Sequence, residues 1–162
     1  MSRIRSATLV HEGGMRFVAT TGTKRVIVMG DDVPAELSPV ETLVVCLASC
    51  SAMDVVSIAT KKRQRIERYE VQVEANQRDE YPQILTDVTV LHEVVGPHVE
   101  EAAIRRAIEL SALKYCPVSA MLSAGATVIH HRYRVRNTGP QPFDAEGEVV
   151  VTGPYRRPDI VA

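Results

Sequence analysis

A long apolar segment, residues 39–61, constrains the fold of this chain more than any other feature. Ser38 precedes it as a helix cap, Pro39 suits the first helical position, and Glu41 completes a capping box. Residues 43–53 are apolar or small on every side of a helix, which predicts a helix buried all round rather than an amphipathic one. The uncharged window is too short to cross a bilayer.

The residues before this helix alternate in short runs between positions 4 and 28. Gly13-Gly14 and Thr21-Gly22-Thr23 break the runs, a pattern typical of a three-stranded antiparallel meander. After the helix, residues 69–76 alternate between apolar and polar types, and residues 84–95 form a second extended run. These two runs predict a hairpin.

The second half of the chain predicts two further helices and a strand. From Val99 to Tyr115 a helix is expected, with Glu101 and Arg105 paired on its outer side and one buried face made by Ile104, Ala107, Ile108, Ser111 and Tyr115. Pro117 then begins a short helix through Leu122 with Cys116 as its N-cap. A strand over residues 127–135 closes a domain of residues 1–136. Residues 137–162, which contain several Pro and Gly, are expected to be an extension with one added strand within 148–152.

Composition excludes several classes of function. The 162 residues suit one domain, and 19 Lys and Arg against 20 Asp and Glu leave a net charge of -1, with no basic footprint for nucleic acid. Three cysteines are an odd and small number for a disulfide-rich secreted protein. No signal peptide or membrane span is apparent. We therefore expect a soluble, cytoplasmic protein that binds neither nucleic acid nor membrane.

Two cysteines are candidates for thiol chemistry. Cys50 lies roughly 18 Å into the apolar helix, beyond the terminal dipole, and Asp54 one turn later would raise the pKa of its thiol. Cys116, at a helix N-terminus, is favoured by sequence physics as the better acid. A cysteine in an apolar helix is more often a packing residue, so spacing leaves this alternative open. Cys46 is interpreted as packing.

Other chemistries have little support in the sequence. His130 and His131 are adjacent on an expected strand and point to opposite faces, and there is no C-x-x-C pair for zinc. The three remaining histidines are scattered and are expected to be exposed or structural: His11, His92 and His98. No nucleophile-elbow motif supports a serine triad. No metal and no other cofactor is expected.

Two segments around the cysteines resemble the OsmC/Ohr family of thiol-dependent peroxidases, and more closely its OsmC-like branch. The first runs from Ser38-Pro39-Val40-Glu41-Thr42-Leu43 to Ala48-Ser49-Cys50-Ser51-Ala52-Met53-Asp54-Val55-Val56. The second contains Ala107-Ile108-Glu109-Leu110-Ser111 and Lys114-Tyr115-Cys116-Pro117-Val118-Ser119-Ala120-Met121-Leu122. The resemblance spans roughly residues 4–135 and leaves out the tail.

This resemblance implies an α+β fold with antiparallel sheets around a long buried helix, in an intertwined homodimer. It also implies a hydroperoxide reductase in which the thiolate of Cys50 attacks an organic hydroperoxide and becomes a sulfenic acid, which condenses with the thiol of Cys116. A thiol or dithiol reductant would then restore both. The catalytic residues that it implies are Cys50 and Cys116, with a cation supplied by the dimer.

One departure from the family pattern keeps other functions open. In the organic hydroperoxide branch a Glu directly after the helix-starting Pro works with an N-terminal Arg, whereas Val40 holds that position here. Glu41 is about half a turn out of phase with Cys50 and is interpreted as a cap, and Arg16 is the nearest candidate for the cation. The alternatives are a redox sensor or small-ligand-binding dimer without turnover, and a structural domain with inert thiols.

Overall fold

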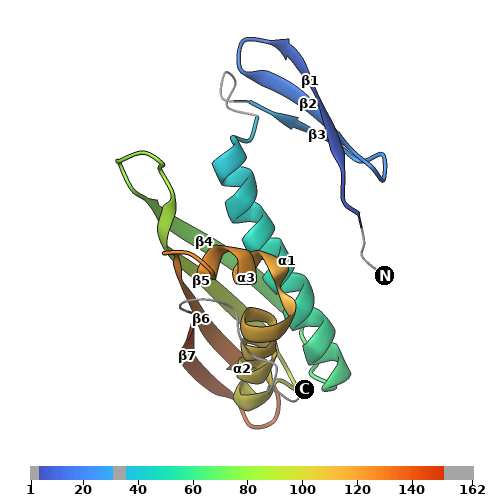
Figure 1. Cartoon of the computed structure of the whole chain (residues 1–162). Coiled ribbons are helices and arrows are strands. Elements are labelled where there is room, and N and C mark those ends of the chain that lie inside the picture. The colour runs from blue at the N-terminus through green and yellow to red at the C-terminus, as the bar shows by residue number, and fades with distance from the viewer. Residues whose placement is uncertain (1–3, 31–35, 152–162) are drawn as a thin grey trace. The chain divides into compact units, whose positions relative to one another are not determined.

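The computed structural model describes residues 4–30 and 36–151, which form two compact units (Figure 1). The first unit comprises Met1–Leu43 and the second Val44–Ala162. The helix α1, Pro39–Lys61, runs across this division. The mixture of helices and sheets is the α+β fold that the sequence predicts.

The first unit is a three-stranded antiparallel sheet in the order β1-β2-β3, which confirms the predicted meander. Its strands are β1 Ala7–Gly13, β2 Arg16–Thr21 and β3 Val26–Met29. Gly13 and Gly14 have φ of 113° and 51° in the turn between β1 and β2, a backbone conformation that favours glycine. Among the described residues of this unit, Ala19 is the one buried hydrophobic residue.

The helix α1 begins with the predicted capping box. The backbone N–H of Ser38 donates to Glu41 Oε2 at 2.8 Å, and the backbone N–H of Glu41 donates to Ser38 Oγ at 3.2 Å. Two backbone donors that the helix leaves unpaired are therefore satisfied. These bonds hold the pKa of the Glu41 carboxyl below its usual value.

The expectation that α1 is buried all round is wrong for the single chain. One face at four-residue spacing is buried, made by Leu47, Ser51, Val55 and Ala59. By length and composition α1 is apolar enough to cross a membrane, and 22% of its most apolar window is buried. A core helix passes the same test, and the buried face of α1 packs against the sheet of the second unit.

The second unit contains a four-stranded sheet in the order β4-β5-β6-β7. Its strands are β4 Arg68–Gln77, β5 Leu85–Gly96, β6 Val128–Asn137 and β7 Phe143–Val151. The hairpin β4-β5 and the pair β6-β7 are antiparallel, whereas β5 and β6 are parallel. A parallel pair needs a crossover connection, and the helices between β5 and β6 supply it.

The strand β7 begins earlier than the sequence predicts. It runs antiparallel to β6 from Phe143 and forms an edge of the sheet, whereas the expected strand lay within 148–152 in an extension outside the domain. The boundary at residue 137 therefore does not coincide with a structural division in the described part of the chain. Residues 152–162 lie outside the described residues.

The crossover consists of α2 Glu101–Leu110, a π-helical turn Ser111–Tyr115, and α3 Pro117–Ser123. The sequence predicts one regular helix to Tyr115 and a buried Tyr115, which is instead 43% exposed. The wider π turn changes the phase of the side chains after Ser111. The expected pair of Glu101 and Arg105 is also replaced, since Arg105 pairs with Glu109 at 3.1 Å.

The helices cover one face of the four-stranded sheet (Figure 1). Two groups of buried side chains fill the space between them. The first joins α1 and α2 to β5 and β6 through residues including Val55, Ala59, Val94, Ile104, Ile108 and Val135. The second includes Leu47, Val88, Val90, Ala112, Cys116 and Ile129. This second group contains Cys116, and Cys50 packs against it.

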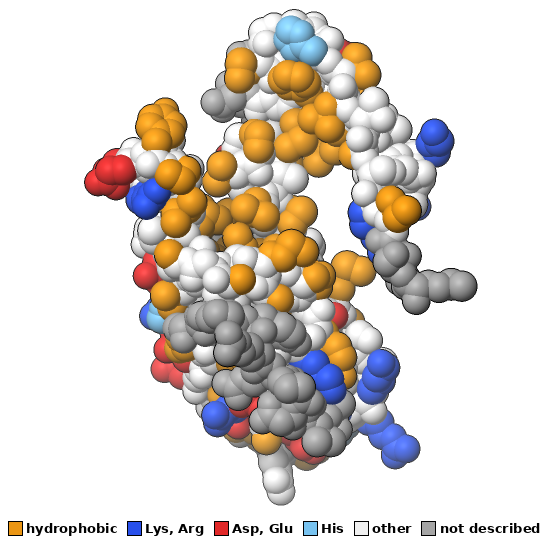
Figure 2. All heavy atoms as spheres, viewed as in Figure 1, with side chains coloured by type: hydrophobic (Ala, Val, Ile, Leu, Met, Phe, Trp, Pro, Cys, Tyr) orange, Lys and Arg blue, Asp and Glu red, His pale blue; other side chains and the backbone are white. Residues whose placement is uncertain are grey.

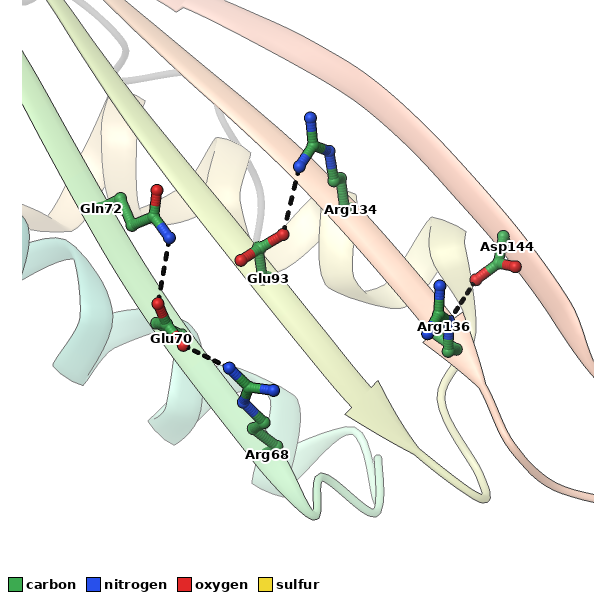
Figure 3. Close-up of polar contacts among 7 residues, drawn as sticks. All are labelled: Arg68, Glu70, Gln72, Glu93, Arg134, Arg136 and Asp144. Atoms are coloured by element: carbon green, nitrogen blue, oxygen red, sulfur yellow. Dashed lines mark hydrogen bonds and ion pairs between the residues drawn. The ribbon is translucent and has the colours of Figure 1, made fainter.

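The other face of the sheet is covered by charged side chains (Figure 3). Within strand β4, Arg68 pairs with Glu70 at 2.6 Å. Across strands, Arg134 pairs with Glu93 at 3.3 Å and Arg136 with Asp144 at 2.7 Å. Alternation of apolar and charged residues along each strand places the ion pairs on the solvated face and leaves the other face to the core.

Candidate active site around two thiols

Cys50 lies in the fourth turn of α1 and is partly buried. It packs against the core group that contains Cys116, beside other partly buried apolar residues: Val44, Val71, Val73, Ala75, Leu113, Val118 and Leu122. These come from α1, β4, the π turn and α3. Cys50 is therefore a partly exposed residue that lies among apolar side chains.

Cys116 lies between the π turn and α3, and it is 1% exposed. Its backbone is extended, with φ of −71° and ψ of 107°, as the N-cap of α3. The backbone N–H of Ser119 donates to its Sγ at 3.3 Å. The predicted capping role of Cys116 is confirmed.

The structure places the two cysteines in one core group, since Cys50 packs against the group that contains Cys116 and is close enough to shift the pKa of the Cys116 thiol. Burial, and then the neighbouring Cys50 side chain and the negative charge that it can carry, raise the pKa of Cys116 to about 12. The N–H of Ser119 opposes this shift but does not offset it. The sequence argument that Cys116 is the better acid is therefore wrong, since desolvation outweighs the helix N-terminus.

Three polar residues form a hydrogen-bonded group between α1 and the π turn: Ser51, Asp54 and Ser111. Ser111 and Ser51 are fully buried, with their Oγ atoms 3.4 Å apart. Ser111 Oγ donates to Asp54 Oδ2 at 3.0 Å. Desolvation raises the pKa of the Asp54 carboxyl, and the Ser111 hydrogen bond partly opposes that shift. The sequence predicts the burial of Ser111 on its helix face, but not its contacts with Asp54 and Ser51.

Comparison with known proteins decides the family. Residues 30–131 match the sequence profile of the OsmC-like protein family. Protein YhfA of Escherichia coli K12 is 36% identical over 121 residues, which cover 72% of this chain and 88% of YhfA. The chain belongs to the OsmC family.

Solved structures agree with this assignment. A hypothetical protein from Aquifex aeolicus VF5 has a TM-score of 0.76 at 29% identity, over 83% of this chain and 98% of that chain. An organic hydroperoxide resistance protein OsmC from Legionella pneumophila has a TM-score of 0.55 at 15% identity, over 83% and 96%. At that identity the second likeness shows the shared fold.

Two further residues of this OsmC-family chain were considered as helpers of Cys50. Arg16 pairs with Glu12 at 3.0 Å and with Glu36, and its assignment as the cation remains a prediction. Glu41 serves as the helix cap described above. Val40, which directly follows the helix-starting Pro39, carries no acid.

Cys46 and the histidines are the other side chains that were considered as metal ligands. Cys46 is exposed in this chain. No group of three or more metal-ligating side chains occurs within residues 4–30 and 36–151. His130 and His131 do point to opposite faces of β6, since His131 is buried and His130 pairs with Glu148 on the outer face.

A hollow of about 560 Å³ lies on the outer face of the sheet and not at the thiols. It is lined by the ion pairs of Figure 3, including Arg134 with Glu93 and Arg136 with Asp144. Because each of these arginines already has a carboxylate partner, the surface has little net charge to attract an anionic ligand. We interpret this hollow as a solvated ion-pair surface.

Proposed function

We propose that this OsmC-family protein is a thiol-dependent peroxidase that reduces organic hydroperoxides through Cys50 and Cys116. The observation that carries the proposal is that the two cysteines pack in one core group, with Cys50 partly exposed and Cys116 buried. A buried Cys116 with a high pKa suits a resolving thiol that reacts second. The apolar surface around Cys50 suits an apolar peroxide.

In the proposed cycle, the thiolate of Cys50 attacks the terminal oxygen of the hydroperoxide. The O–O bond breaks, an S–O bond forms, and the leaving alkoxide takes a proton to become an alcohol. The sulfenic acid of Cys50 then condenses with the thiol of Cys116, releasing water and forming a disulfide. A thiol or dithiol reductant reduces that disulfide by exchange and is itself oxidised.

A homodimer is part of the proposal. The first unit has Ala19 as its one buried hydrophobic residue among those described, and α1 exposes Val45, Met53 and Val56. Figure 2 shows hydrophobic side chains at the surface of both units. A three-stranded sheet without a core needs a partner surface to be stable. We infer that a second copy of the chain supplies that surface, in the cytoplasm, where both thiols stay reduced between turnovers.

The test is consumption of cumene hydroperoxide with dithiothreitol as reductant. We expect Cys50→Ser to abolish turnover and Cys46→Ser, the matched control on the same helix, to keep it. Cys116→Ser should accumulate a sulfenic acid at Cys50 that dimedone traps. Equal turnover by wild type and Cys50→Ser would reject the proposed peroxidase activity.

The second candidate function is a redox sensor or ligand-binding dimer without fast turnover. Val40 in place of a carboxylate and the pairing of Arg16 with Glu12 and Glu36 favour it, because an arginine already paired is a weaker activator of a thiolate. In that case one equivalent of hydroperoxide oxidises Cys50 but steady-state recycling by reductant is absent. Efficient recycling would reject the sensor.

A further inference from the structure

The backbone of Ser111 holds the backbone of Cys116. The chain widens into a π turn over Ser111–Tyr115, and at its end the N–H of Cys116 donates to the carbonyl oxygen of Ser111 at 2.9 Å. π turns inside helical segments are uncommon and are often found at functional sites. This turn sets both the position and the direction in which Cys116 leaves the helix.

The side chain of the same residue holds the segment of α1 that carries Cys50. Ser111 Oγ contacts Asp54 Oδ2 at 3.0 Å and Ser51 Oγ at 3.4 Å. A hydroxyl has one proton, and an ionised carboxylate only accepts. Ser111 Oγ is thus the donor toward both Ser51 Oγ and Asp54 Oδ2, and its one proton goes to one acceptor at a time, with Asp54 the nearer of the two.

These contacts lie within one helical turn of Cys50. Ser51 is the next residue in α1, and Asp54 follows Cys50 by four residues, which is about one turn. Ser111 thus bonds through its side chain to the turn of α1 that bears Cys50 and through its main chain to Cys116. Both serines are fully buried, so water does not replace these bonds when they are present.

We infer that Ser111, held by Asp54 and Ser51, is a positioning residue that keeps the Cys116 thiol beside Cys50 for disulfide formation. We call these three residues the Ser111 clamp. The inference rests on the proposed function, because it assigns a role in the second step of that cycle.

The chemical consequence concerns condensation and not attack on peroxide. When the sulfenic acid of Cys50 meets the thiol of Cys116, the S–O bond breaks and the S–S bond forms. The hydroxyl leaves with the thiol proton as water. The rate and equilibrium of this step depend on the effective concentration of one sulfur atom at the other, which is higher when the fold holds both atoms close together before they react. The clamp raises that concentration by fixing both segments to one residue.

The clamp is tested by the equilibrium constant of the Cys50–Cys116 disulfide in dithiothreitol redox buffers. Ser111→Ala and Asp54→Ala should each lower this equilibrium constant roughly tenfold, because each removes about one hydrogen bond. Asp54→Asn keeps an acceptor for Ser111 and should retain most of the wild-type value. Ser49→Ala is the matched control, since Ser49 and Ser51 flank Cys50 and Ser49 is exposed. The inference is overturned if the equilibrium constants of Ser111→Ala and Asp54→Ala lie within twofold of that of Ser49→Ala.

A second measurement separates failure of the clamp from failure of the proposed function. If wild type forms no Cys50–Cys116 disulfide, the peroxidase cycle is wrong. The clamp is then judged by alkylation of Cys116 with iodoacetamide in reduced protein. Loosening the clamp should speed this reaction roughly tenfold in Ser111→Ala relative to Ser49→Ala, and equal rates overturn the inference. If Ser111→Ala does not fold, Ser51→Ala and Asp54→Ala test the clamp by the same two measurements, the disulfide equilibrium constant and the rate of Cys116 alkylation.

Discussion

His92 Nε2 lies 3.1 Å from His131 Nδ1 in the buried face of the four-stranded sheet. Tyr69 Oη extends the chain of contacts, at 2.7 Å from His92 Nδ1. Both histidines are fully buried, and no described protein group pairs with His131 Nε2. Because the imidazoles are removed from water, each is held in its neutral form.

We predict that this pair makes the fold sensitive to acid. Burial lowers the pKa of His131 to about 4, and burial together with the neighbouring imidazole lowers that of His92 to about 3. Unfolded histidines titrate near 6.5, so the unfolded chain binds protons first as the pH falls. Stability is therefore complete above pH 6.5 and is lost between pH 6.5 and about 3, by at most ~3 kcal/mol per pH unit while both groups contribute.

The measurement is the free energy of unfolding in urea at several pH values in that window. The triple variant Tyr69→Phe, His92→Leu and His131→Leu removes the whole chain of polar groups and should flatten the pH dependence. His98→Gln replaces an exposed histidine and should keep it. A triple variant with the wild-type slope would contradict the prediction.

Sequence patterns predicted most of the elements around this pair but not the pair itself. Alternation along residues 69–76 and 84–95 gave the hairpin because apolar residues must face the core. The same alternation puts His92 in phase with Val90 and Val94, a sign of burial that the expectation of an exposed or structural His92 did not use. Its partner on β6 depends on the parallel register of β5 and β6, which a crossover of three helical segments determines and local sequence does not.

A second prediction concerns the order in which the thiols react. With a pKa of about 12, Cys116 is a thiolate in roughly one molecule in ten thousand at pH 8, against about a quarter for a free cysteine. Iodoacetamide should therefore modify Cys116 at least a thousandfold more slowly than glutathione at that pH. Peptide mass spectrometry of the reduced protein gives the rate. Modification as fast as that of glutathione would contradict the assigned burial.

The thiols illustrate where sequence reasoning fails. The N-cap position of Cys116 was predictable from Pro117, since proline favours the first helical position. Its acidity was not, because the dominant effect is desolvation by residues remote in sequence, followed by contact with Cys50. The π turn was also missed, since a 3.6-residue pattern to Tyr115 fits the sequence equally well.

A third prediction separates the two roles considered for Glu41. As the partner of Ser38 in a capping box, it should affect the stability of the fold and not the thiols. Ser38→Ala should cost about 1 kcal/mol of unfolding free energy, and Glu41→Gln should cost less. Alkylation of Cys50 should proceed at the wild-type rate in both variants. A tenfold slower reaction in Glu41→Gln alone would instead assign Glu41 to the site.

The final prediction tests the homodimer through the exposed face of α1. Met53 is 74% exposed in the single chain, and in a monomer Met53→Lys would change stability by no more than about 0.5 kcal/mol. In the proposed dimer the same substitution places a charge in an apolar interface, where desolvation is costly. Sedimentation should then show dissociation, and the melting temperature should fall and become dependent on concentration.

Val150→Lys, on the charged outer face of the sheet, is the matched control and should leave the assembly intact. A monomeric wild-type protein, or a Met53→Lys variant that assembles normally, would mean that another surface stabilises the first unit.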